Sequence, residues 1–152
     1  MIRHLLENEV AALRLLEEAG TATLRHIYRQ RPDRRPVHAA DLGQLVRLVL
    51  ERDGALAGTV SYQRGEDRMH LPRLFVAPAL LRQGLARRLV EHVAELSRAE
   101  NRSFLTLFTI RETGNVAIFQ RLGFLVEHED VDETVIGILA PVLHSVFMRR
   151  RA

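Results

Sequence analysis

The most informative part of this chain is LFVAPALLRQGLARR, residues 74–88. Its apolar run ends at Pro78, a short loop follows, and a helix begins at Gly84. The first backbone N–H groups of a helix have no partner within the helix, and the helix dipole makes that end positive. Small residues such as Gly84 and Ala86 let a ligand approach this backbone closely. The stretch therefore predicts a strand, a loop and a helix start that together can bind phosphate.

A plainer interpretation of the same loop stays open. Gly84 can simply begin the helix, and the neighbouring arginines can form its solvated face. These arginines are Arg82, Arg87 and Arg88. One glycine-rich turn is a weak signal of function. The elements on either side of the loop are therefore needed to choose between phosphate binding and a plain helix start.

The pattern downstream of the loop alternates between helix and strand periods. Residues 83–99 carry apolar side chains at helical spacing, with charged residues on the opposite face. Residues 103–110 form an almost unbroken apolar run, which predicts a central strand covered on both faces. The last two strands are expected over 124–130 and 142–149.

A short helix is expected over 116–122, between the strands expected over 103–110 and 124–130. Asn115 is a good N-cap for it. Gly123 stands where a left-handed residue is needed after the helix, so Phe124 can pack on Phe119.

Upstream of the loop, three antiparallel strands are expected over 44–51, 55–63 and 69–76. Asp53-Gly54 between the first two is a strong hairpin signal. Residues 65–67 make the next turn. Together with the downstream elements, these strands predict an α+β (mixed α/β) layer fold, in one domain over residues 1–152.

The N-terminal part of the chain is less regular. Apolar spacing predicts a helix over 5–18, with Gly20 ending it. Residues 21–29 allow a helix or a strand, and their β-branched and aromatic residues favour the strand. Residues 29–41 contain Pro32, Pro36 and several arginines, and predict an irregular connection.

Composition excludes several function classes. All 22 basic residues are arginine and 19 residues are acidic, which gives a net charge of +3 spread evenly along the chain. This balance argues against nucleic-acid binding. Cysteine is absent, so disulfides, thiolate metal sites and a cysteine nucleophile are excluded. The seven histidines show no ligand spacing, so no metal is expected. We find no signal peptide or membrane span in the sequence and expect a cytoplasmic protein.

Two stretches of the chain resemble the signatures of the GNAT superfamily of acyl-CoA-dependent N-acyltransferases. The first is Leu81-Arg82-Gln83-Gly84-Leu85-Ala86, at a helix start after a strand that ends in proline. The second is Phe119-Gln120-Arg121-Leu122-Gly123-Phe124, at the end of a short helix. The match is firm over 74–124, extends over 44–149, and is absent before about residue 40, where the chain is atypical.

This resemblance implies a central splayed mixed sheet of about six to seven strands with helices on both faces. It implies that the pantetheine arm of acetyl-CoA lies between the strands that end near Val76 and Ile110. Phe75 and Val76 would offer backbone groups to that arm, and Asn115 and Phe119 would face it. The pyrophosphate would be held by backbone N–H groups of the loop and helix start, namely Arg82, Gln83, Gly84, Leu85, Ala86 and Arg87.

The sequence departs from the family pattern at two positions. Leu81 stands where the family usually has glutamine or arginine, so we expect weaker CoA binding. Phe119 stands where the family often has a tyrosine that protonates the leaving CoA thiolate. The thiolate must then leave unassisted or through water, or another group must act, or the chain performs no transfer.

Removal of a proton from the acceptor amine needs a base near the strand over 69–76. His70 is the candidate by residue type, although a histidine on a strand is more often structural. Glu66 and Asp67 lie on the preceding turn. The acidic run over 127–133 can attract a cationic amine, but a solvated loop is the simpler interpretation.

The sequence therefore predicts an acetyl-CoA-dependent N-acetyltransferase that works by direct attack of an amine. The acceptor, a small molecule or a protein amine, is not identified. A non-catalytic acyl-CoA-binding module is the alternative, and Phe119 is the argument for it. Homodimer formation is left open.

Overall fold

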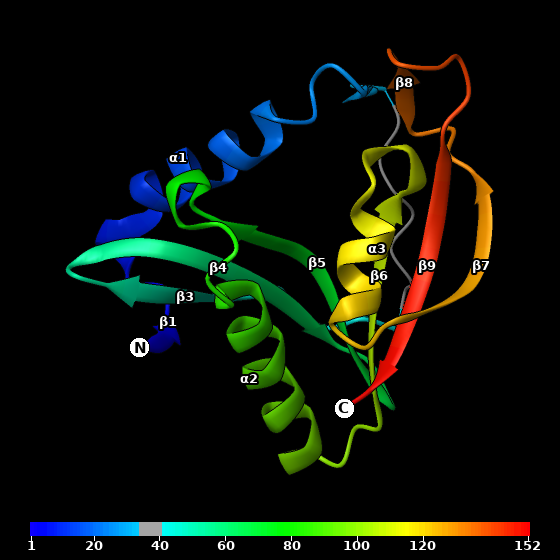
Figure 1. The fold of residues 1–152 in the computed structure, drawn as a ribbon. Helices are drawn as coiled ribbons and strands as arrows, with labels where there is room; N and C mark the ends of the chain where they lie inside the picture. Colours follow the sequence, from blue (N-terminus) through cyan, green and yellow to red (C-terminus); the bar gives the residue numbers. More distant parts are fainter. Residues whose placement is uncertain (34–40) are drawn as a thin grey trace.

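The computed structural model describes residues 1–33 and 41–152 (Figure 1). Nine strands lie within these residues: β1 Ile2–His4, β2 Tyr28–Gln30, β3 Val46–Arg52, β4 Ala55–Arg64, β5 Arg68–Val76, β6 Phe104–Ile110, β7 Leu125–Val131, β8 Val135–Gly137 and β9 His144–Arg151. The helices are α1 Val10–Ala22, α2 Leu85–Ala99 and α3 Asn115–Arg121. Short 3₁₀ turns lie at η1 Glu7–Glu9, η2 Pro78–Leu80 and η3 Arg111–Thr113.

Seven strands form one mixed sheet in the order β1-β3-β4-β5-β6-β9-β7, and β2 pairs with β8 in a separate two-stranded sheet. Among the strands of residues 1–33 and 41–152, β5 and β6 form the one parallel pair of the large sheet, because α2 connects them. The expected mixed α+β fold, with about seven strands and helices on both faces, is confirmed.

Helices α1 and α2 cover opposite faces of the sheet. Neighbouring residues of β5 point to opposite sides and therefore contact different helices. Phe75 lies against α1, where a Cβ at Gly20 would stand 2.3 Å from the Phe75 ring. Leu74 and Val76 pack instead in the main core with the apolar face of α2. Leu89, Val90 and Val93 of α2 are fully buried, as the helical spacing predicts.

The region from β3 to β5 agrees with the sequence prediction. Asp53 and Gly54 both have positive φ, 53° and 78°, so they form the two-residue turn that this dipeptide favours. Strand β5 contains a bulge, because Ser61 pairs with Arg73 whereas Gln63 pairs with His70. The bulge therefore includes Leu71 and Pro72. A bulge is a position in a strand that tolerates proline, because the missing N–H is not needed for the ladder there.

The N-terminal predictions need correction. The helix expected over 5–18 runs from Val10 to Ala22 and continues through Gly20. Gly20 is a packing residue here, since any side chain would collide with Phe75. Residues 23–27 form turns, so the strand expected over 21–29 is wrong except at its end, where β2 begins. The irregular connection expected over 29–41 lies partly outside the described residues, at 34–40.

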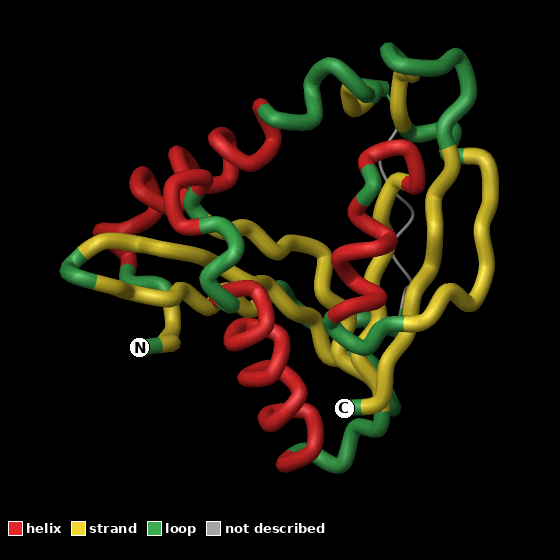
Figure 2. The backbone as a smooth tube through the Cα atoms, viewed as in Figure 1, coloured by secondary structure: helices red, strands yellow, loops and turns green. Residues whose placement is uncertain are grey.

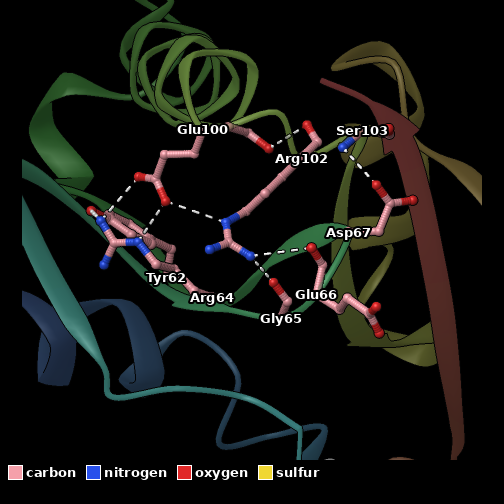
Figure 3. A network of polar contacts seen from close by, with 9 residues as sticks. Tyr62, Arg64, Gly65, Glu66, Asp67, Glu100, Arg102 and Ser103 are labelled. Atoms are coloured by element: carbon pink, nitrogen blue, oxygen red, sulfur yellow. Dashed lines mark hydrogen bonds and ion pairs between the residues drawn. The ribbon is translucent and has the colours of Figure 1, made fainter.

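A network of polar contacts joins the turn between β4 and β5 to the connection between α2 and β6 (Figure 3). Arg102 Nη1 donates hydrogen bonds to the carbonyl oxygens of Gly65 and Glu66. Arg64 donates to both carboxylate oxygens of Glu100, at 2.7 and 3.0 Å. Asp67 accepts from the backbone N–H of Ser103 at 3.3 Å. These contacts hold together the ends of β5 and β6 that are paired.

Strand β7 forms one edge of the large sheet. All seven of its residues are exposed, and a bulge interrupts its pairing with β9 between Val126 and His128. Two of its carboxylates form ion pairs with neighbouring elements: Glu127 with Arg149 at 2.8 Å, and Glu129 with Arg111. The acidic run is therefore partly neutralised in the fold.

Candidate functional site

Strands β5 and β6 are paired at one end and separate at the other (Figure 2). The ladder contains Arg68–Phe104, Met69–Leu105 and His70–Thr106, and then stops. Within the described residues, no pair joins 71–76 of β5 to 107–110 of β6. The two strands thus enclose a V-shaped opening whose apex is the His70–Thr106 pair.

The V exposes backbone groups of β5, because an extended strand needs partners on both of its edges. The N–H of Ala77 donates to the carbonyl of Ala57 at 2.8 Å, so alternate residues of β5 are bonded to β4. This alternation turns the backbone groups of Val76 and Leu74 towards the V and those of Phe75 towards β4. The predicted role of Val76 fits this geometry, whereas that of Phe75 does not. Leu74 was missed, although alternation along the strand offered the signal.

The loop between η2 and α2 has a backbone shaped to surround a small anion. Arg82 and Gly84 both adopt left-handed conformations, with φ of 64° and 77°. Such a conformation costs a residue with a side chain about 1–2 kcal/mol, and strain of this kind tends to occur at functional sites. Successive N–H groups in turns of this kind point to one centre and attract anions. A Cβ built on Gly84 would meet nothing within 4 Å, so the space beside this backbone is open.

Helix α2 begins at this loop without a cap. Its N-cap residue is Gly84, and no side chain in the described part of the protein accepts a hydrogen bond there. The first N–H groups of α2 are therefore left for solvent or a ligand. A phosphate fits this arrangement, because the N–H groups and the helix dipole act on the same point.

The side chains of the loop are engaged in different ways. Gln83 accepts a 2.6 Å hydrogen bond from Arg52 of the β3–β4 hairpin, which fixes the loop against the sheet. Leu85 is buried in the core, and Ala86 packs against the same core. Arg87 donates to the backbone carbonyl of Arg121 at 2.8 Å. The guanidinium of Arg87 is thus used to hold the end of α3, and only its backbone N–H is left for a phosphate.

The start of α3 differs from the prediction. Gly114, with φ of 81°, occupies the N-cap position, so Asn115 is the first residue of the helix and does not cap it. Thr113 takes the bonding role instead, because its hydroxyl accepts from the N–H of Asn115 at 3.2 Å. The Thr-Gly pair before Asn115 was the signal in the sequence, since glycine tolerates this left-handed conformation.

The end of α3 is confirmed as predicted. Gly123 has φ of 95°, and the N–H of Phe124 donates to the carbonyl of Phe119 at 3.0 Å. The rings of Phe119 and Phe124 meet edge to face, with centroids 6.0 Å apart. Arg150 of β9 donates to the Leu122 carbonyl at 2.9 Å and to Glu91 of α2 at 2.8 Å. Phe119 is therefore a packing residue at the terminus of α3.

His70 lies at the apex of the V, in the last pair of the β5–β6 ladder. The imidazole is buried, with 6% of the residue exposed. Its Nδ1 lies 3.0 Å from Oγ1 of Thr106, which is itself buried. The ring of Phe108 stands edge-on to it, with centroids 5.8 Å apart. Of the residues considered as bases, only His70 stands at the apex, because Glu66 and Asp67 belong to the turn at the paired end.

Two surface cavities lie away from the loop at the start of α2. One of about 340 Å³ is lined by residues of the paired end and of β6, β7 and β9, including Thr106 and Phe147. Another of about 530 Å³ lies between the end of α1 and β2. The V is a better candidate site than either cavity, because strand edges and an uncapped helix bind ligands without enclosing them.

Two further observations concern metal ions and membranes. Among residues 1–33 and 41–152, no group of three or more histidine and acidic side chains could hold a metal ion. Within the same residues, no helix has the length and apolar character needed to cross a bilayer.

Comparison with known proteins identifies the family of this chain. The chain matches the family model "Acetyltransferase (GNAT) family" over residues 10–124. The match therefore includes N-terminal residues in which the sequence analysis found no resemblance. This protein therefore belongs to the GNAT acetyltransferase family.

Solved structures of such enzymes have the same fold. A PaiA N-acetyltransferase from Thermoplasma acidophilum in complex with coenzyme A is 14% identical, with a TM-score of 0.74 over 100% of this chain and 98% of that one. A ribosomal-protein-alanine N-acetyltransferase from Brucella melitensis is 17% identical, with a TM-score of 0.69 over 100% and 99%. A nourseothricin acetyltransferase is 18% identical, with a TM-score of 0.71 over 99% and 97%. At these identities the likeness concerns the fold alone.

Proposed function

We propose that this protein is an N-acetyltransferase that transfers the acetyl group of acetyl-CoA to a primary amine by direct attack. The observation that carries the proposal is the V between β5 and β6, whose open end adjoins the uncapped start of α2. One part offers strand-edge hydrogen bonds to an extended arm, and the other offers N–H groups to a pyrophosphate. Acetyl-CoA contains both an extended arm and a pyrophosphate.

The residues of the loop divide the binding of CoA between them. Backbone N–H groups of residues 82–87 bind the pyrophosphate, and Arg82 adds a fixed positive charge. Backbone groups of Val76 and Leu74 bind the pantetheine arm. Leu81 is exposed and offers no hydrogen bond, so binding depends on the backbone.

The chemistry takes place at the apex of the V. The amine nitrogen attacks the thioester carbonyl carbon, the carbon–sulfur bond breaks, and CoA leaves as its thiolate. The attacking nitrogen gives up a proton to His70, which acts as the general base. A covalent relay through cysteine is excluded, because the chain contains no cysteine. The products are the acetylated amine and CoA.

A non-catalytic acyl-CoA-binding module is the second candidate. Phe119 favours it, because its ring packs on Phe124 and carries no proton for the departing thiolate. We favour the enzyme, since a CoA thiol is acidic enough to leave without an acid. A missing general acid costs about 10²–10⁴-fold in rate and does not abolish catalysis.

The acceptor is proposed only as a primary amine, on a small molecule or a protein. Two of the similar structures carry names that refer to a ribosomal-protein alanine and to nourseothricin, so this fold accommodates acceptors of very different size. We further propose that residues 1–152 act as one cytoplasmic domain. Whether two copies associate does not enter the mechanism.

The test is acetyl-CoA turnover with detection of the free thiol, against a panel of polyamines, aminoglycosides, amino acids and peptide N-termini. Isothermal titration with CoA is run in parallel. Thiol release with one amine class, together with a matching mass increase of 42 Da on that amine, is the expected result. Binding of CoA without release for any amine would favour the binding module. If CoA does not bind and no thiol is released with any amine, both candidates are overturned.

A further inference from the structure

The buried contact between His70 and Thr106 has a consequence for the state of the imidazole. Neutral histidine carries its proton on one ring nitrogen and its lone pair on the other, and only the lone pair can take a proton. Which nitrogen is protonated depends on the groups that accept from or donate to the two ring nitrogens. Here Nδ1 is 3.0 Å from the Thr106 hydroxyl oxygen.

We propose that Thr106 is a positioning residue that accepts a hydrogen bond from Nδ1–H of His70 and so keeps the lone pair on Nε2. This inference rests on the proposed function, in which His70 takes the amine proton. The same contact also serves the protonated ring, because imidazolium donates from both nitrogens. Thr106 can therefore accept from Nδ1 before and after proton transfer, without rearrangement.

The location of Thr106 supports this role. It pairs with His70 in the last step of the β5–β6 ladder, so backbone hydrogen bonds fix the two side chains relative to each other. Both residues are buried, with 2% and 6% exposed, and their contact is shielded from water. Phe108 stands edge-on to the imidazole from the next position on the same face of β6. The ring is thus held by one polar and one apolar neighbour on β6.

Three arginines on the same face of the sheet form ion pairs with carboxylates. On β5 these are Arg68, which lies 3.5 Å from Asp41, and Arg73, which lies 3.1 Å from Glu17 of α1. On β9, Arg149 pairs with Glu127 of β7 at 2.8 Å.

The neighbouring uncharged groups are equally unaffected by a change at Thr106. Gln63 of β4 faces His70 across the ladder and does not titrate. Among the described residues, His128 of β7 is a second titratable ring on this face, and it stacks on Phe147. A valine at position 106 removes the hydroxyl and leaves all these groups unchanged, so a change in the titration of His70 would report on the Thr106 contact.

The test uses Thr106→Val, which keeps the shape, and Thr106→Ser, which keeps the hydroxyl. Long-range ¹H–¹⁵N NMR of the free protein gives the tautomer and titration of His70, with His70→Gln identifying its signals. We expect Nδ1–H in the wild type and in Thr106→Ser. In Thr106→Val we expect more of the Nε2–H form and a pKa lower by about one unit, because the imidazolium loses an acceptor. A wild-type ring with the proton on Nε2 would overturn the proposal.

Kinetics separate this inference from the proposed function. Thr106→Val should lower kcat/KM about tenfold or more and move its acid limb to lower pH, while CoA affinity stays within twofold. Thr106→Ser should have the kcat/KM and the acid limb of the wild type. A uniform loss at every pH, with a lower Tm and an unchanged limb, would mean a merely structural role and would overturn the proposal. If the wild type turns over no amine, the proposed function fails and the catalytic role of Thr106 fails with it, whatever the tautomer.

Discussion

The two ends of the β5–β6 pair differ in what joins the strands. At one end three ladder pairs and the network around Arg102, Arg64 and Glu100 connect them (Figure 3). At the other end the strands separate, and the adjoining loop has two left-handed residues beside an uncapped helix. Hydrogen-bonding capacity is thus satisfied by the protein at the closed end and is left for a ligand at the open end. Changes at the two ends should separate stability from binding.

The largest effect is expected at the open end, from Gly84→Glu. A carboxylate there would occupy the open space beside the loop and repel a pyrophosphate. We expect CoA affinity to fall at least about 100-fold, or about 2.7 kcal/mol, by isothermal titration.

Gly54→Glu is the matched control for this change. Gly54 has a similar φ of 78° and equally open space, but it lies in the β3–β4 turn. Its variant should bind CoA as the wild type does. Equal loss in the two variants would assign the effect to left-handed strain, and wild-type affinity in a folded Gly84→Glu would place the phosphate elsewhere.

Breaking the closed end should produce the opposite pattern. Arg102→Ala leaves the carbonyls of Gly65 and Glu66 without their charged donor and removes a contact to Glu100. We expect the free energy of unfolding to fall by about 1–3 kcal/mol in urea titrations, with CoA affinity within twofold of wild type. Arg98→Ala, at an exposed arginine of α2, should change neither quantity. A loss of affinity larger than the loss of stability in Arg102→Ala would show that the ends are coupled.

A smaller effect at the closed end depends on pH. The pKa of Glu100 is lowered in the folded protein, chiefly by the hydrogen bond from Arg64 and also by Arg102. A lowered folded-state pKa contributes stability above the ordinary value of 4.5, and this contribution is lost as pH falls through the folded-state pKa.

Glu100→Gln should therefore be less stable than wild type at pH 7 by at most about 1 kcal/mol, because the group lies near the surface. The two unfolding curves should converge below pH 4.5. Tm measured from pH 3 to 8 checks this, and a gap that persists at low pH would mean that charge on Glu100 is not the cause.

The smallest effect is expected from Phe119→Tyr. Because Phe119 packs edge-on against Phe124, the added hydroxyl extends a packed ring and does not supply an acid. We expect single-turnover rates within twofold of wild type and a loss of stability of about 1 kcal/mol or less, since the ring is only half-buried. A rate gain of about tenfold without loss of stability would show that the position lies at the thioester sulfur.

The sequence predicted best the elements whose signals are local. Helix α2 follows from its apolar spacing, and the hairpin follows from Asp53-Gly54. The end of α3 follows from Gly123. In each case one periodic apolar face or one residue with positive φ was enough to predict the element, and distant contacts agreed with that local signal.

Elements that depend on distant partners were missed or misjudged. Strands β1, β2 and β8 have three residues each, too few for any period to appear. Gly20 was taken as a helix end because its close contact with Phe75 is not visible in sequence. The same limit holds at the site: the loop was located by its residue types, whereas the Thr106 contact of His70 requires the strand register.

The exposed edge strand β7 has a bearing on self-association. A seven-residue strand with unpaired backbone groups is a template for adding another strand, and proteins oppose this with charge and bulges. Here the bulge interrupts the regular edge, and antiparallel pairing of two copies centred on His128 would bring Glu127 of one against Glu129 of the other. Like charges directly opposite each other disfavour such a pair. The bulge and this charge pattern therefore disfavour the addition of a second β7 in this register.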